Sequence, residues 1–313
     1  MFVVRRLLQT VPVLVLVSMA VFSLVRLVPG GPGIHLIGAN GTEADLQRVN
    51  HQLGLDQSLP RQYVHWVGDA MRGNLQVSLQ RGLDVTRLMR LALPTTLELA
   101  LCAFVVSVGI GIPLGVMAGV HPGSRWDWLL AGFTGVTIGI PNFLMGIVLL
   151  WLFGVKLHWL PIVGSGATIF QDPVAAFRPL ILPTLSLGFG SAAVLARYTR
   201  TSVQGVMSQD FIRTARAKGL PEHRVIIQHG LRAALIPVVT VVALQVGRLL
   251  TGAIVVETVF TRPGLGRTLV QAIEFRDYPV VQGMLLFLVV IFIVVNLMAD
   301  VAYGMIDPRV RVQ

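Results

Sequence analysis

Four ionisable residues stand inside or at the ends of long apolar stretches of the sequence. They are Glu98, Arg248, Glu257 and Asp300. Charged side chains at membrane depth are costly and often mark the path of a solute, so these four could line such a path. The alternative is structural, because such residues also pair with one another or sit at the membrane interface. The residue types leave both interpretations open.

A second candidate is the basic segment RTARAKGLPEHRVIIQHG, residues 213–230. Its first part is typical of a helix that ends at Gly219, and its second part restarts a helix. The segment offers three charges and two short side chains to another surface: Arg213, Arg216, Lys218, Ala215 and Ala217. The alternative is a solvated loop whose charges only orient the chain in a membrane.

Motifs for catalysis and nucleotide binding are absent from the sequence. It contains no G-x4-G-K-[ST], H-E-x-x-H, C-x-x-C or G-x-S-x-G. Cys102 is the single cysteine, so a disulfide framework is excluded and we expect a small packing residue there. The energy for any transport must therefore come from an ion gradient or from another chain.

The composition is that of a polytopic membrane protein. The 313 residues are 54% hydrophobic and 13% charged, and the mean hydropathy is +0.74. Six apolar stretches are long enough to cross a hydrocarbon layer of about 30 Å: Leu7–Val28, Thr96–Val120, Trp128–Val155, Leu180–Arg197, Ile236–Val256 and Gly283–Tyr303. Pro183, Gly188 and Gly190 dilute the fourth, but neighbouring helices can satisfy the freed backbone groups. We expect an all-α membrane protein with six transmembrane helices.

The net charge of +10 is explained by orientation in the membrane, so we expect no nucleic acid partner. With the N-terminus inside, the inner segments carry twelve Lys and Arg residues and the short outer loops carry five. An excess of basic residues marks the cytoplasmic side. Both termini are therefore expected in the cytoplasm.

The segment after the first apolar stretch is expected to be helical and to lie outside the cytoplasm. It opens with the breaker cluster PGGPG and continues with NGTEADLQRVNHQLG, a candidate helix. A second helix is expected to start just after Pro60, with Tyr63, Trp66, Val67, Ala70 and Met71 on one face. We expect this face to pack against the bundle or the membrane interface.

Seven motifs, taken in order, resemble the membrane subunits of binding-protein-dependent ABC importers, in the branch for dipeptides, oligopeptides and nickel. The match is closest to the B-type membrane subunit and covers nearly the whole chain. The motifs are RRLLQTVPVLVLVSMAVFSLVRLVPG, LGLDQSLPRQYVHW with GNLQVSLQ, LPTTLELAL, RYTRTSVQGVMSQDFIRTARAKGL, VVETVFTRPGLGR, FRDYPVVQG and VNLMADVAYGMIDPRVR.

The resemblance implies a type I importer permease fold with four parts. Residues 1–28 would hold the cytoplasmic N-terminus and the first helix, and residues 29–93 an extracytoplasmic helical loop. Residues 94–303 would form the core, with a coupling loop at 198–235, and residues 304–313 a cytoplasmic tail.

The resemblance also implies the partners. They are a second homologous membrane subunit, two ATPase subunits that bind ATP and magnesium, an extracytoplasmic substrate-binding protein and the lipid bilayer. This chain would itself hold no cofactor and catalyse no reaction. It would lie in the cytoplasmic membrane of a bacterium or an archaeon.

The family's cytoplasmic pattern, E-A-A-x3-G-x9-I-x-L-P, places its glycine at Gly219. The resemblance implies a coupling helix that docks into the ATPase subunit, made of Asp210, Phe211, Arg213, Thr214, Ala215, Arg216, Ala217, Lys218 and Gly219. Pro141 and Pro183 are candidate hinges, because proline removes a backbone hydrogen bond. Glu98, Glu257 and Asp300 are common in the family across substrates, which favours a structural role.

Three positions depart from the family's usual pattern. Gly31 and Asn74 stand where an acidic residue is common, and Arg262 stands where tryptophan is common. We hypothesise that these changes make the outer mouth less acidic and disfavour a cationic ligand such as nickel.

Peptides are the commonest cargo in the resemblance, but nickel chelates, glutathione and oligosaccharides use the same scaffold. An ion-coupled secondary transporter is the alternative of a different class. It would predict inverted repeats and ion-binding residues at the midplane, which the sequence does not display. A third alternative, an intramembrane enzyme, would need a nucleophile or a set of metal ligands, and the sequence displays neither pattern.

Overall fold

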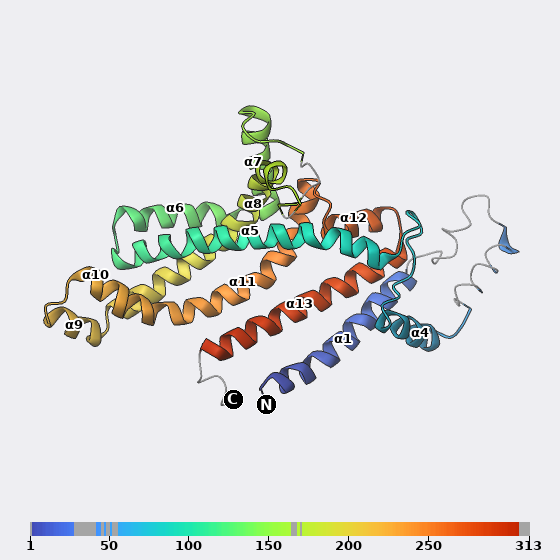
Figure 1. Ribbon diagram of the computed structural model, residues 1–313, viewed down its shortest axis with the longest axis horizontal. Helices are drawn as coiled ribbons and strands as arrows, with labels where there is room; N and C mark the ends of the chain where they lie inside the picture. The colour runs from blue at the N-terminus through green and yellow to red at the C-terminus, as the bar shows by residue number, and fades with distance from the viewer. Residues whose placement is uncertain are drawn as a thin grey trace. The chain divides into compact units, whose positions relative to one another are not determined.

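The computed structural model describes residues 2–27, 42–44, 47, 51, 56–163, 168–169 and 171–306, with side chains described from Gln9 to Met298. These residues form helices and no strand, and one isolated bridge joins Val77 and Asp84. The elements, labelled in Figure 1, are α1 (Phe2–Arg26), α4 (Leu59–Met71), α5 (Val85–Val120), α6 (Arg125–Gly139), α7 (Asn142–Leu149), η1 (Leu150–Lys156), α8 (Pro173–Met207), α9 (Asp210–Ala217), α10 (Glu222–Arg224), η2 (Val225–Leu231), α11 (Arg232–Val259), α12 (Leu265–Glu274) and α13 (Tyr278–Ile306). The two η elements are π-helices.

Five helical segments among the described residues are long and apolar enough to cross a membrane. They are Gln9–Arg26, Val85–Val120, Pro173–Met207, Glu222–Val259 and Tyr278–Met298. The number of spans rises to six if a bent pair of helical segments is counted as one span. This pair is Arg125–Gly139 with Asn142–Lys156. The expectation of an all-α membrane protein is confirmed, and so is the fourth span, which is a continuous helix of 35 residues.

The third expected span, Trp128–Val155, is sharply bent in the structure. The chain breaks at Ile140, and the segments on either side meet at 105°. Pro141 stands at the N-cap of α7 with an extended backbone (φ −58°, ψ 145°). Because proline disfavours helical conformation in the residue before it, Ile140 is extended as well.

The described chain divides into two compact units, and residues 1–93 with 264–294 make the first. In this unit α4 packs on α1 through a cluster centred on Val21, Phe22 and Trp66. The Tyr63 hydroxyl lies 2.8 Å from Ser18 Oγ. The helix expected after Pro60 is confirmed, although Met71, on its expected inner face, is 85% exposed. The candidate helix within NGTEADLQRVNHQLG lies largely outside the described residues.

A buried carboxylate joins two distant motifs of this first unit. Asp277 is 3% exposed and accepts hydrogen bonds from Ser78 Oγ at 2.5 Å, Leu79 N at 3.1 Å and Gln80 N at 3.3 Å. The resembling motifs GNLQVSLQ and FRDYPVVQG therefore meet in space. Three donors on one carboxylate make a strong link between the segment before α5 and the turn before α13.

The variant Asp277→Ala is expected to destabilise the protein by about 3 kcal/mol, because a buried hydroxyl and two backbone N–H groups lose their acceptor. The matched control is Asp69→Ala in α4, whose side chain is 27% exposed and pairs with flanking side chains. The midpoint of thermal unfolding in detergent measures both. Equal, small shifts would contradict the role given to Asp277.

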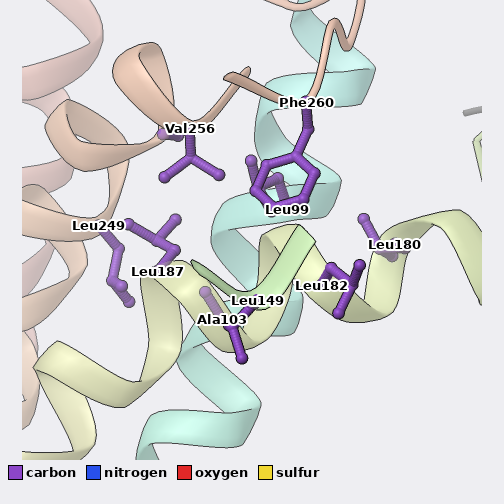
Figure 2. Close-up of a cluster of buried hydrophobic side chains, with 10 residues drawn as sticks. Leu99, Ala103, Leu149, Leu180, Leu182, Leu187, Leu249, Val256 and Phe260 are labelled. Atoms are coloured by element: carbon purple, nitrogen blue, oxygen red, sulfur yellow. The ribbon is translucent and has the colours of Figure 1, made fainter. Parts of the chain in front are cut away.

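The second unit comprises residues 94–263 and 295–313, and its described core joins four helices. Figure 2 shows side chains from α5, α7, α8 and α11 converging on one another. Leu99, Leu187 and Leu249 are each at most 1% exposed. Cys102 is partly buried and packs against this cluster, so its expected packing role is confirmed.

Glycines let α5 approach α8 closely within the second unit. A Cβ atom placed on Gly115 would lie 2.5 Å from the Ala196 oxygen and 2.6 Å from Thr199 Cβ. Gly111 and Gly119, four residues away on either side, meet α8 in the same way. Small residues at this spacing allow close backbone contact in membranes. We call Gly111, Gly115 and Gly119 the glycine seam.

Candidate functional site

The candidate site is the elbow that joins α8 to α11, residues 208–231. Figure 1 shows α9 and α10 together at one end of α8 and α11. Ile212 and Ala215 of α9 are buried, at 0% and 7% exposure, in a cluster with Val225 of η2. This apolar contact fixes α9 against the returning chain. Ala215 was expected to let another surface approach closely; its side chain contributes to the elbow's own apolar cluster, and a contact with another chain stays a prediction.

The turn after α9 depends on the backbone of Gly219. Its φ is +77°, in the left-handed region that glycine adopts without strain. Its N–H donates to Arg216 O at 2.9 Å, and Lys218 N donates to Thr214 O at 3.0 Å, which satisfies carbonyls at the helix end. No atom lies within 4 Å of a Cβ placed there. The backbone conformation, not space, therefore requires glycine.

An ion pair closes the turn on its outer side. Arg216 donates from Nη2 to Glu222 Oε1 at 2.6 Å and from Nε to Oε2 at 3.1 Å. This bidentate contact raises the pKa of the Arg216 guanidinium above its ordinary value. Arg216 thus holds α9 to α10, and its expected contact with a partner stays a prediction.

The outer face of α9 presents an aromatic ring among charges. Phe211 is 42% exposed, and the exposed side chains of Asp210 and Arg213 pair at 3.5 Å. Thr214, Ala217 and Lys218 are exposed as well. A short, internally fixed helix with one apolar anchor can dock into a groove of another protein.

The expected hinge residues occupy different settings. Pro141 stands at the break between α6 and α7, whereas Pro183 lies within the continuous helix α8. Beside Pro141, Asn142 is wedged between α8 and α11. Its carbonyl accepts from Ser186 Oγ at 2.7 Å, and its Oδ1 would lie 2.7 Å from a Cβ on Gly190. The hinge role itself stays a prediction.

Comparison with known proteins identifies the family. A family model described as "Binding-protein-dependent transport system inner membrane component" matches residues 111–312, and the model of the N-terminal part of such components matches residues 1–100. The chain belongs to this family. It is therefore a permease subunit of an ABC importer, an integral inner-membrane component with a non-catalytic role that works with ATPase and substrate-binding partners.

Relatives match the permease along its whole length. The probable peptide ABC transporter permease protein y4tP of Sinorhizobium fredii is 37% identical over 99% of both chains. The glutathione transport system permease protein GsiC of Escherichia coli K12 is 41% identical over 99% of this chain and 98% of its own. A crystal structure of an amino acid ABC transporter with histidines covers 72% of this chain and 94% of its own, with TM-score 0.51 and 17% identity. That last likeness shows the fold alone.

Glu98 of the permease forms a buried ion pair. Its Oε2 lies 2.5 Å from Arg262 Nη2, and the two residues are 1% and 5% exposed. Its Oε1 accepts a hydrogen bond from Ile169 N. The pair thus joins α5 to the chain before α8 and the turn after α11. Arg262 was hypothesised to make the outer mouth less acidic, but it is buried and neutralised by Glu98.

The other three ionisable residues differ from one another. Glu257 is fully buried in α11, at 0% exposure. Asp300 belongs to α13, and its side chain lies outside the described ones. Arg248 is exposed on α11 and forms no ion pair with the described residues. Of the four, the structure thus shows a structural pairing for Glu98.

Sequence reasoning missed the glycine seam and Asp277. The signal for the seam was present as three glycines spaced by four within a long apolar stretch. Asp277 gave no such signal, because its partners lie about 200 positions away in the sequence and a lone aspartate in a turn is common.

Proposed function

We propose that this permease imports short peptides. The observation that carries the proposal is the match, over 99% of the chain, to permeases named for peptide and for glutathione transport. Glutathione is itself a small peptide, so it is the second candidate within the same chemistry. The buried Glu98–Arg262 pair removes the charge argument that we had raised from Arg262 against a cationic cargo.

The cargo is tested with the complete transporter in proteoliposomes, loaded with ATP and supplied with its own carrier protein. Uptake of radiolabelled alanyl-alanine, of glutathione and of nickel is compared. We expect peptide uptake that requires ATP. Uptake of nickel alone would contradict the peptide proposal, and uptake driven by a proton gradient without ATP would favour the secondary transporter.

We further propose that the elbow receives the movement of the ATPase subunits. Three features of the elbow support this proposal. The short helix α9 is held by the buried side chains of Ile212 and Ala215, an ion pair closes the turn, and Phe211 is exposed. Rigid-body movement passes best through an element that does not deform. The full assembly would hold a second homologous membrane subunit, two ATPase subunits that bind ATP and magnesium, and one outer carrier protein. The elbow and both termini would face the cytoplasm.

The variant Gly219→Pro is expected to lower ATP-driven uptake by at least about tenfold. Proline fixes φ near −65° and removes the N–H that bonds Arg216 O, so the turn cannot close. Gly219→Asn is the matched control, because asparagine tolerates the left-handed region. Uptake and cargo-stimulated ATP hydrolysis are measured at equal membrane levels. If Gly219→Pro and Gly219→Asn behave alike, the turn has no role in coupling.

A further inference from the structure

Arg248 lies deep within a membrane-spanning helix. α11 runs from Arg232 to Val259, and Arg248 stands about 24 Å from its first residue and about 17 Å from its last. The helical span begins earlier, at Glu222, but any stretch of about 30 Å that lies within α11 itself includes Arg248. A guanidinium at this depth needs water or an anion beside it.

The helix turns two different faces to its surroundings. Gln245, Leu249 and Val256 are at most 3% exposed, and Gln245 Nε2 donates to Ser191 O of α8 at 3.2 Å. Arg248 lies on the opposite, exposed face. Its exposed neighbours at helical spacing are Leu244, Thr251, Val255 and Thr258. Three of these five side chains are polar, which is unusual for a face that meets lipid.

Arg248 differs from the two threonines on this face. Thr251 Oγ1 donates to Gly247 O at 3.2 Å and Thr258 Oγ1 donates to Ile254 O at 3.1 Å, so each is satisfied within its own helix. Among the described residues, no carboxylate or carbonyl reaches the guanidinium of Arg248. Its five N–H groups are thus available to a group from outside the chain.

We propose that this face of α11 lines the water-filled path of the transporter, and that Arg248 binds a carboxylate of the peptide in transit. The inference rests on the proposed function, because a short peptide carries the C-terminal carboxylate that a guanidinium holds in a bidentate contact. A lipid-facing position is disfavoured by the charge of Arg248 and by its place within α11. Arg248 is then a specificity-determining residue for anionic ends of the cargo.

The first test measures the access of water, in the assembled transporter without cargo. In a Cys102→Ala background, Arg248→Cys and Leu244→Cys are treated with an anionic, membrane-impermeant methanethiosulfonate. The cysteine thiolate attacks the sulfur of such a reagent and displaces methanesulfinate, and the thiolate forms readily only in contact with water. Ala253→Cys, at a position that is 0% exposed on the opposite face, is the control. We expect Ala253→Cys to react at least about tenfold more slowly than Arg248→Cys and Leu244→Cys. If Arg248→Cys is as slow as Ala253→Cys, then lipid or another subunit covers the face and the inference is overturned.

The second test measures uptake of alanyl-alanine from its loaded carrier protein. Arg248→Met keeps an unbranched side chain but removes the charge and the N–H donors, and uptake should fall by roughly tenfold or more. Arg248→Lys keeps the charge and should recover part of the uptake, which a packing role would not predict. Wild-type uptake by Arg248→Met, or no recovery by Arg248→Lys, overturns the carboxylate contact. If the wild type imports no dipeptide, the cargo proposal fails, while the thiol reaction still decides whether α11 lines the path.

Discussion

Replacing Gly115 with leucine is expected to prevent α5 and α8 from packing together. The first side-chain carbon alone would lie 2.5 Å from the Ala196 oxygen, which is backbone and cannot turn away. Overpacking of this kind costs about 3 kcal/mol or more. Because the α5–α8 contact is part of the second unit's core, we expect little folded permease in the membrane.

The control for this prediction lies on the same helix. Gly109 is exposed, and nothing lies within 4 Å of a Cβ placed there. Gly109→Leu therefore adds the same side chain to α5 without a clash. Size-exclusion chromatography of fluorescently tagged protein in detergent measures the folded fraction of each variant. Equal yields from Gly109→Leu and Gly115→Leu would show that the seam can open at no cost.

Removing Arg262 is the second change with a large expected effect. Arg262→Met leaves the carboxylate of Glu98 buried without its cation, and breaking such a pair costs about 3–5 kcal/mol. The double variant Glu98→Gln with Arg262→Met removes both charges, and the glutamine oxygen can still accept from Ile169 N. We expect the double variant to be more stable than Arg262→Met alone.

The thermal midpoint is measured for the four forms of this cycle: the wild type, Glu98→Gln, Arg262→Met and the double variant. Arg213→Met is the matched control, because the Arg213–Asp210 pair is exposed at 74% and 95% and contributes little. A midpoint for Arg262→Met near that of Arg213→Met would contradict the structural role of the buried pair. A double variant less stable than both single variants would contradict the charge argument.

Much of the fold follows from patterns that are local in the sequence. Apolar length predicted the spans, and the stripe of Tyr63 and Trp66 predicted α4 and its packing. The turn at Gly219 was also predictable, since glycine followed by Leu-Pro is a strong helix end. These features depend on a few neighbouring residues, so one sequence is enough to find them.

The features that were missed depend on contacts between distant segments. From the sequence, Arg262 was interpreted as a charge at the outer mouth. In the structure it forms an ion pair with Glu98, which lies 164 positions earlier in the sequence. The inward turn of Ala215 depends on Val225 folding back across the elbow. The spacing of charges in the sequence cannot tell that Arg248 is exposed and Glu98 is buried. Only the packing of the helices shows which side chains are covered.

The bend at Ile140 has a consequence for the sidedness of everything that follows it. Each crossing of the bilayer reverses the side on which the chain emerges. If α6, α7 and η1 together make one crossing, then α9 emerges on the same side as the N-terminus, after four reversals. If the bent pair enters and leaves by one surface, α9 emerges on the side opposite the N-terminus, and the proposed contact of Phe211 with a cytoplasmic ATPase would then require the N-terminus to lie outside. Whether the bent pair crosses the membrane or returns to the same surface thus decides on which side of the membrane the elbow lies relative to the N-terminus.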